Sequence, residues 1–298
     1  MEQFTNCNIC PHHCNSNRKI GQIGNCKAGA MPKVALVSLH NYEEPCISGK
    51  NGSGTVFFSN CNMHCVYCQK HEISQQGKGK EISIERLASI FVEEQERGAE
   101  NINLVTPTSY VPAIIEAIKL AKAKGVTIPF VYNTNGYETI ETIQSLKGYI
   151  DIYLPDFKYA KEELGRIYSK VNNYPSIAKE AILEMYKQVG KPFFNKKGMM
   201  QKGIIIRHLI LPGEIENTKQ VLKWIEETFQ NNVYVSVMAQ YFPTYLAKEK
   251  NILNRKITKE EYQEVENYLY SLNLENGYIQ ELGEHEEEYV PNFNLNGV

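Results

Sequence analysis

Apolar runs alternate along most of the chain with segments in which apolar residues recur every three or four positions. The runs are rich in β-branched and aromatic residues, as strands are, and the intervening segments have the period of amphipathic helices. Alternation of this kind is typical of parallel βα units, in which a helix follows each strand and covers the sheet. The six strands that it predicts lie at residues 55–58, 101–106, 128–133, 150–154, 204–211 and 233–238.

Several of the predicted helices begin and end at characteristic residues. Ser83 is a typical N-cap, Pro112 lies near the first turn of the next helix, and Gly125 stops that helix. The last helix opens with the capping box Thr258-Lys-Glu-Glu261 and runs to about residue 272. Six strand–helix units are fewer than the eight of a closed barrel. The other helices are predicted over residues 139–147, 176–189 and 218–229.

The first 32 residues do not share this pattern, because they hold four cysteines among glycines and polar residues and little apolar content. Neither an internal repeat nor a low-complexity linker interrupts the rest of the chain. We therefore expect a cysteine-rich metal-binding extension at residues 1–32 and a single domain at residues 33–298. Within that domain, glycines and a proline predict loop and turn over residues 40–54. Cys46 in this stretch is expected as a small buried side chain, with a ligand or a reactive thiol as the alternative.

The composition argues against several classes of protein. The 298 residues carry 32 Lys and Arg against 34 Asp and Glu, and the net charge of −2 gives no reason to expect a nucleic acid or a membrane surface as partner. The first residues lack the features of a signal peptide, and no apolar run approaches the roughly 18 residues of a transmembrane helix. All eight cysteines lie within the first 68 residues, whereas the disulfides of a secreted protein would spread through the fold. We expect a soluble cytoplasmic protein with reduced thiols.

Four cysteines of the extension have the spacing C-x2-C-x3-C-x11-C, at Cys7, Cys10, Cys14 and Cys26. Four thiols close a tetrahedral site with no open position, so this spacing is a strong signal for a metal. It is a weak signal for which metal, because structural zinc, a second iron–sulfur cluster and unmetallated or redox thiols all stay open. His12 or His13 is an alternative ligand in place of one thiol.

Three further cysteines, Cys61, Cys65 and Cys68, follow the first predicted strand with the spacing C-x3-C-x2-C. Three thiols cannot complete a tetrahedral zinc site, and a cubic [4Fe–4S] cluster takes a thiolate on each of its irons. If these three bind a cluster, one iron is left for a substrate or cosubstrate to coordinate. The alternative is half of a zinc knuckle with a distant fourth ligand, for which His64 and His71 are the candidates.

Polar residues follow the predicted strands at their carboxyl ends, where parallel βα folds collect their ligands. A purely structural sheet would carry turn residues there rather than charged groups. Together these residues predict a polar mouth around the three-cysteine loop. They are Thr106, Thr108, Thr134, Asn135, Asp156, Lys158, Arg207 and Gln240.

The three-cysteine spacing, with Tyr67 just before the last cysteine, resembles the signature of the radical S-adenosylmethionine (SAM) superfamily. From about residue 55 to about residue 240 the chain is similar to the activating enzymes of glycyl-radical proteins, such as pyruvate formate-lyase activating enzyme. This similarity rests also on Thr-Asn-Gly after the third strand, Asp-x-Lys after the fourth and Pro-Gly after the fifth. The extension looks like that of a related, largely uncharacterised branch. The family's Gly-Gly-Glu after the second strand is replaced by Thr106-Pro-Thr108.

The resemblance implies an α/β fold of the partial (β/α)6 barrel type, with a [4Fe–4S] cluster and SAM as cofactors. The cluster would bind the three cysteines, chelate the amine and carboxylate of SAM at its open iron and pass an electron to the sulfonium. The resulting 5′-deoxyadenosyl radical would abstract a substrate hydrogen. Asp156 and Lys158 would form a charge pair near the reacting centre. The residues implied to contact SAM are Tyr67, Thr106, Thr108, Thr134, Asn135, Arg207 and Gln240.

Two classes of function stay open. The first is a radical SAM enzyme that acts on a protein glycine, as glycyl-radical activases do, or on a small molecule, with a reductant such as flavodoxin or ferredoxin. The second is a non-catalytic iron–sulfur electron carrier or a zinc-stapled scaffold. Binding and cleavage of SAM separate the two classes, and the sequence does not name the substrate.

Overall fold

A computed structural model describes residues 2–283 and 290–298 of the chain. Ten strands in this part form one sheet in the order β10-β9-β8-β6-β5-β4-β2-β1-β3, with β7 paired to β8. Six of them, β2, β4, β5, β6, β8 and β9, are parallel neighbours in the order of the chain. β10 adds a parallel strand at one side, and β1 adds an antiparallel strand at the other.

The strands are β1 (Lys33–His40), β2 (Ser53–Phe58), β3 (Lys80–Glu81), β4 (Ile102–Val105), β5 (Phe130–Thr134), β6 (Ile152–Pro155), β7 (Phe193–Phe194), β8 (Met200–Leu209), β9 (Tyr234–Met238) and β10 (Gly277–Ile279). The helices are α1 (Pro45–Ser48), α2 (His71–Ser74), α3 (Ile84–Glu96), α4 (Val111–Ala123), α5 (Ile140–Ser145), α6 (Glu162–Ser169), α7 (Tyr174–Val189), α8 (Ile215–Phe229) and α9 (Lys259–Ser271). The six strands predicted from the apolar runs are therefore confirmed, with shifts of a few residues at their ends.

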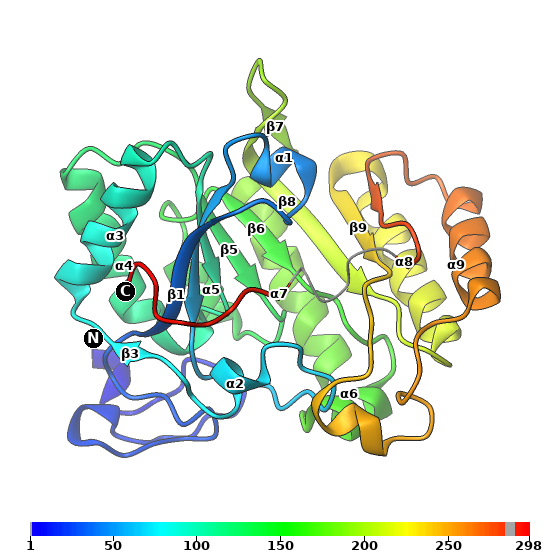
Figure 1. The fold of residues 1–298 in the computed structure, drawn as a ribbon, viewed down its shortest axis with the longest axis horizontal. Helices are drawn as coiled ribbons and strands as arrows, with labels where there is room; N and C mark the ends of the chain where they lie inside the picture. The colour runs from blue at the N-terminus through cyan, green and yellow to red at the C-terminus, as the bar shows by residue number, and fades with distance from the viewer. Residues whose placement is uncertain (1, 284–289) are drawn as a thin grey trace.

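The longer helices cover the outer side of the sheet, with α3 and α4 at one flank and α8 and α9 at the other (Figure 1). Their apolar faces carry the core, as in α3, where Leu87, Ile90 and Phe91 are buried behind the Ser83 cap. The capping box that opens α9 is also confirmed. The described part of the chain holds no helix long and apolar enough to cross a bilayer.

The prediction of loop and turn over residues 40–54 is wrong in part, because α1 and the first residues of β2 lie there. β1 was not predicted either, although its residues form an apolar run. It pairs antiparallel to β2, with His40 opposite Ser53 at the beginning of β2. The chain therefore passes from the carboxyl end of the parallel strands to their amino end before the first βα unit starts.

α1 closes the amino end of the barrel. Cys46 and Ile47 are buried there in one cluster with Val131, Ile152 and Ile205 from the parallel strands. Cys46 is thus a small buried side chain, as expected. The residues just before α1 reach into the barrel, where Glu43 contacts side chains of β4, β5 and β8. The segment 41–48 therefore forms the floor of the barrel interior.

The cysteine-rich extension packs at the opposite end of the barrel, beside the loop that follows β2 (Figure 1). Arg18 fixes it, because the buried guanidinium lies 4.4 Å from the ring centroid of Phe4 and donates to the carbonyls of Gly29 and Ser109. The last residues of the chain run along β1, where Val37 donates to the carbonyl of Asn296 at 2.9 Å.

Candidate active site

The three-cysteine loop begins where β2 ends. Asn60 takes a positive φ of 69°, and its side chain accepts a hydrogen bond from Tyr110 at 3.2 Å, which turns the chain away from the sheet. The thiols of the loop, at Cys61, Cys65 and Cys68, then line a cavity of about 290 Å³. Its walls are the carboxyl ends of the parallel strands, and its floor includes Glu43. This is the position at which parallel βα folds bind their ligands.

Each of the three sulfur atoms has a polar neighbour outside the loop's own thiols. Cys61 Sγ accepts from the Asn135 amide at 3.3 Å, and Cys65 Sγ lies 3.0 Å from the hydroxyl of Ser169. Cys68 Sγ lies 3.2 Å from the hydroxyl of Ser74. Hydrogen bonds to ligating sulfur atoms stabilise thiolates and tune the potential of a cluster, so these contacts suit a metal-bound state.

Burial raises the pKa of the Cys65 thiol to about 11, although the nearby Lys158 ammonium opposes the shift. Burial also raises the pKa of Cys61 well above its ordinary value. Without a metal the two thiols are therefore neutral, and an iron–sulfur cluster would supply the positive charge that stabilises their thiolates.

The donor set fits a four-iron cluster better than a single metal ion. Within residues 2–283 and 290–298, no three His, Cys, Asp or Glu side chains converge as ligands of one ion. The zinc-knuckle alternative needs a histidine, but His64 Nδ1 bonds to Gln75 and the His71 ring stacks on Tyr245. A cluster instead takes each thiolate on a different iron, and three thiols leave one iron open.

The polar residues predicted at the strand ends divide into two groups. Thr108 lies behind the wall of the cavity, and so does Tyr67 of the cysteine loop, which was also expected to contact SAM. The Tyr67 hydroxyl meets that of Tyr159 at 2.5 Å, and Thr108 donates to Glu138 at 2.6 Å. The residues that line the cavity are Thr106, Thr134, Asn135, Asp156, Lys158, Arg207 and Gln240.

Thr106 has an unusual backbone conformation, with a φ of 60°. A β-branched residue rarely adopts this left-handed conformation, because its side chain crowds the backbone there. The strain falls at the end of β4, at the position where the sequence departs from Gly-Gly-Glu. The left-handed conformation of Thr106 turns the chain sharply between β4 and the helical turn that leads to α4.

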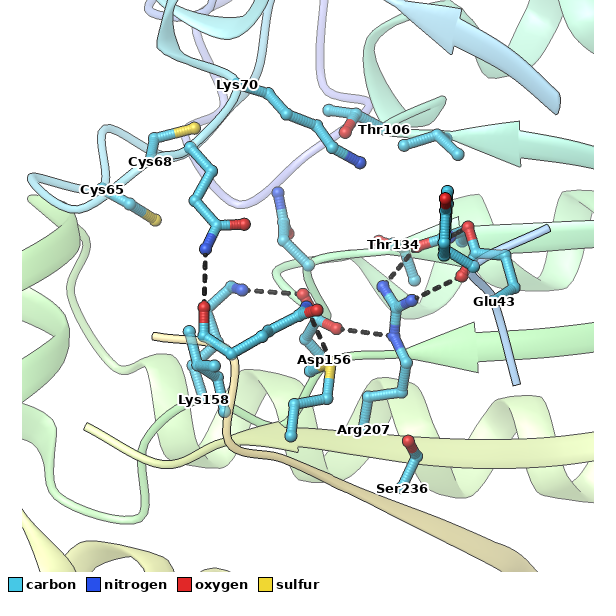
Figure 2. Close-up of a pocket in the computed structure, with 18 of the residues that line it drawn as sticks. Glu43, Cys65, Cys68, Lys70, Thr106, Thr134, Asp156, Lys158, Arg207 and Ser236 are labelled. Atoms are coloured by element: carbon cyan, nitrogen blue, oxygen red, sulfur yellow. Dashed lines mark hydrogen bonds and ion pairs between the residues drawn. The ribbon is translucent and has the colours of Figure 1, made fainter. Parts of the chain in front are cut away.

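Charged side chains form a network across the cavity (Figure 2). Arg207 donates from Nε to Asp156 at 3.0 Å, from one terminal nitrogen to Glu43 at 3.0 Å and from the other to Asn133 at 2.6 Å. Lys158 Nζ donates to the second oxygen of Asp156 at 2.7 Å. Burial alone would raise the pKa of Asp156, but the two cations outweigh it and hold that pKa below its ordinary value. Asp156 is therefore ionised, and both of its oxygens are engaged.

Glu43, Asn133 and Lys70 belong to the cavity, although the sequence analysis did not single them out. The sequence could have indicated Lys70, since it stands two residues after Cys68 of the predicted cluster site. It could also have indicated Asn133, the last residue of a predicted strand. Nothing in the sequence indicated Glu43, because its place in the cavity depends on how the segment 41–48 folds back into the barrel.

Glu138 is a second group that the sequence analysis missed. Its Oε1 accepts from Thr134, Thr108 and Tyr132, so it ties the end of β5 to the turn after β4. Burial outweighs these hydrogen bonds and raises the pKa of Glu138 to about 7. Its Oε2 is buried without a hydrogen-bond partner among the described residues. Glu138 thus stabilises the wall of the cavity through hydrogen bonds on the side that faces away from the open space.

The cysteines of the extension do not converge as ligands of one metal ion among the described residues. Burial, together with smaller contributions from Cys26 and Cys14, raises the pKa of Cys10 to about 12, so these three thiols lie near one another. The Sγ of Cys7 lies 3.8 Å from a terminal nitrogen of the Arg18 guanidinium. Gly24 packs so tightly on Cys14 that an added Cβ would come within 2.6 Å of its sulfur.

The extension also touches the loop directly. His12 Nε2 lies 2.7 Å from the carbonyl of Asn62, and the Asn25 amide bridges His12 and His64 at 2.9 and 3.0 Å. His12 and His64 are therefore contact residues between the two cysteine groups, which lie side by side.

The protein is thus an open parallel α/β barrel that carries three thiols at the mouth of its central cavity. Residues 55–225 match the family described as the radical SAM superfamily. The chain belongs to this superfamily, which uses a [4Fe–4S] cluster and SAM. It is 33% identical over 285 residues to an uncharacterized protein of Methanocaldococcus jannaschii, across 91% of this chain and 76% of that protein.

Solved structures share the fold. The structure titled native anSMEcpe with bound AdoMet aligns with a TM-score of 0.50 and 15% identity, over 72% of this chain and 57% of that one. Its complex with AdoMet and the Cp18Cys peptide aligns with a TM-score of 0.50 and 14% identity, over 73% and 60%. This chain therefore spans little more than half the length of these structures, and the likeness concerns the barrel.

Proposed function

We propose that this chain is a radical SAM enzyme in which Cys61, Cys65 and Cys68 hold the [4Fe–4S] cluster and the cavity takes SAM and a substrate. The observation that carries the proposal is the position of three thiols, with no fourth among the described lining residues, on the wall of a polar cavity. The bound cluster supplies the electron for reductive cleavage of SAM, which leads to hydrogen abstraction.

The residues of the cavity have distinct roles in this proposal. Asn135, Ser169 and Ser74 donate toward the sulfur atoms and steady the thiolates. Asp156 and Lys158 form the charge pair nearest the thiols and act at the reacting centre, since the Lys158 charge reaches Cys65.

The remaining strand-end residues divide between contact with SAM and support of the site. Thr106, Thr134, Asn135 and Gln240 offer hydroxyls, amides and carbonyls to SAM. Arg207 anchors the floor, because all three of its nitrogens are already engaged. Tyr67 and Thr108 support the wall from behind.

We further propose that residues 1–32 are a metal-binding extension and residues 33–298 the catalytic domain. Arg18 supports a metal on Cys7, Cys10, Cys14 and Cys26, because its buried guanidinium lies 3.8 Å from the Cys7 sulfur and forms no ion pair with a carboxylate among the described residues. A buried cation needs an anion nearby, and a metal bound by four thiolates carries net negative charge. Metal analysis of the purified protein and of a Cys10→Ala variant distinguishes zinc from a second iron–sulfur cluster.

For the substrate, we propose a hydrogen donor that enters the barrel, either one residue of a protein or peptide or a small molecule. A protein glycine, as in glycyl-radical activation, is the form suggested by the motifs after the third, fourth and fifth parallel strands. The cavity is partly enclosed by the strand ends, which favours a side chain, a short backbone segment or a small molecule over a folded domain. A low-potential donor such as flavodoxin or ferredoxin would supply the electron.

The test is an anaerobic assay of SAM cleavage. The protein is reconstituted with iron and sulfide, reduced with dithionite, incubated with SAM and assayed for 5′-deoxyadenosine, with Cys65→Ala beside it. Release by the wild type and none by the variant supports the enzyme. A wild type that holds its iron and binds SAM, yet releases none even with candidate peptides and small molecules, contradicts it and favours an electron carrier or scaffold.

A further inference from the structure

Lys70 projects into the cavity from the segment just after Cys68, and its ammonium group points toward the centre of the space (Figure 2). Its contact with the protein is with an aromatic ring, since Nζ lies 4.8 Å from the ring centroid of Phe57. The described residues provide no hydrogen bond or ion pair to Nζ. Lys70 is therefore a cation without an anionic partner inside a partly enclosed cavity.

The other cations of the cavity are already neutralised. Arg207 is bound to Asp156, Glu43 and Asn133, and Lys158 is bound to Asp156. The two acids that bind these cations, Asp156 and Glu43, have no free oxygen for Lys70. The third acid that lines the cavity, Glu44, has a buried Oε2 without a hydrogen-bond partner among the described residues, but it forms no ion pair with Lys70 there. Both oxygens of Asp156 are engaged, and those of Glu43 accept from Arg207 and from the amides of Asn103 and Asn133.

The electrostatic surroundings give the same result. The Arg207 guanidinium lines the same cavity and is a second positive charge there, and no described anion forms an ion pair with Lys70. An ammonium in this setting is stabilised by an anion brought from outside. Charge-assisted hydrogen bonds from ammonium to carboxylate or phosphate are short and strong in an enclosed site.

We propose that Lys70 binds the anionic group, a carboxylate or a phosphate, of a ligand in this cavity. Two molecules are sources of that group: SAM through its methionyl carboxylate, or the substrate through an acidic group of its own. The inference rests on the proposed function of the cavity. It adds a recognition residue that Arg207, with its nitrogens already occupied, does not provide.

The experiment measures binding rather than turnover, so it is independent of whether SAM is cleaved. Reconstituted wild type, Lys70→Met and Lys70→Arg are compared by anaerobic equilibrium dialysis with SAM and with decarboxylated SAM. Methionine keeps the length and apolar stem of lysine without its charge, and arginine keeps the charge. Lys122→Met is the matched control, because Lys122 is exposed and also lies over an aromatic ring, 5.8 Å from the centroid of Phe130.

If the anion is the carboxylate of SAM, Lys70→Met weakens SAM binding about tenfold or more, and decarboxylated SAM binds all the variants alike. Lys70→Arg restores part of the loss, and Lys122→Met binds as the wild type does.

If the anion belongs to the substrate, SAM binds Lys70→Met normally. Inorganic phosphate or acetate then protects Lys70 of the SAM-loaded wild type from acetylation, as read by mass spectrometry, and does not protect Lys122.

Unchanged SAM affinity together with no protection by either anion overturns the proposal. A loss of iron and sulfide from Lys70→Met overturns it too, because Lys70 would then act as a counter-charge for the cluster through Cys68. Iron and sulfide are therefore measured on every sample. Failure of the proposed function gives a different result, because the wild type itself then binds no SAM.

Discussion

Asp156 and Arg207 meet both through their backbones and through their side chains. They form a parallel bridge where β6 and β8 end, and the Arg207 Nε donates to Asp156 Oδ1 at 3.0 Å. The next residue, Phe157, donates its backbone N–H to the carbonyl of Arg207 at 2.8 Å. Because both contacts lie within the protein, the charged floor of the cavity is formed before any ligand binds.

Arg207→Met is expected to lower the free energy of unfolding by about 3 kcal/mol, because it leaves the buried carboxylates of Glu43 and Asp156 short of a partner. Adding Asp156→Asn should cost less than the sum of the two single changes. Urea unfolding followed by circular dichroism measures both. Arg255→Met is the control, because its ion pair with Glu261 is more exposed and should contribute at most about 1 kcal/mol. Strict additivity of the double variant would contradict the network.

His208 is expected to make stability depend on pH. Burial lowers its pKa to about 4, and its ring lies between the carbonyl of Phe157 and the hydroxyl of Thr218. The unfolded chain therefore binds a proton near pH 6.5 that the folded protein does not accept until about pH 4. Wild-type stability should fall by up to about 3 kcal/mol relative to His208→Gln as the pH drops through this window. Parallel curves of unfolding free energy against pH would rule this out.

Thr106 offers a test of backbone strain at the mouth of the cavity. Thr106→Gly should be more stable than Thr106→Ala by about 1 kcal/mol, because only glycine adopts the φ of 60° without cost. Thermal unfolding of the two variants measures the difference. Both lack the hydroxyl, so both should bind SAM more weakly than the wild type and to a similar degree. An alanine variant as stable as the glycine variant would show that the strain is absent in solution.

The two groups of cysteines should lose metal independently. Cys65→Ala should lose the iron of the cavity and keep the metal of the extension, and Cys10→Ala should do the reverse, because their thiols belong to separate segments. Elemental analysis and electron paramagnetic resonance of the reduced proteins measure this. Cys46→Ala should keep both, since Cys46 is buried among apolar residues behind the cavity. Loss of all metal from either of the first two variants would point to a single shared site.

The sequence was informative wherever the determinant of structure is local. The six parallel strands follow from runs of apolar residues, and the caps at Ser83 and Thr258 follow from single residues and their neighbours. The gathering of Asp156, Lys158 and Arg207 at one cavity could also be predicted, because the carboxyl ends of parallel strands always meet.

Features set by the folded chain as a whole could not be predicted. Tyr67 lies between two cavity-lining cysteines, yet the turn of the loop directs its ring toward Tyr159 instead of into the cavity. Glu43 and α1 stand in a stretch of turn-forming residues, and their place inside the barrel depends on the antiparallel course of β1. Nothing local in the sequence records that β1 runs against its neighbour.

The position of the thiols and the depth of the cavity depend on different segments of the chain. The thiols lie after β2, whereas the floor comes from residues 41–48, which precede the first parallel strand. A longer or shorter segment there would deepen or shallow the space under the cofactors and leave the cysteine loop in place. In the proposed function, the length of this short segment therefore sets how much depth the barrel interior leaves for a substrate.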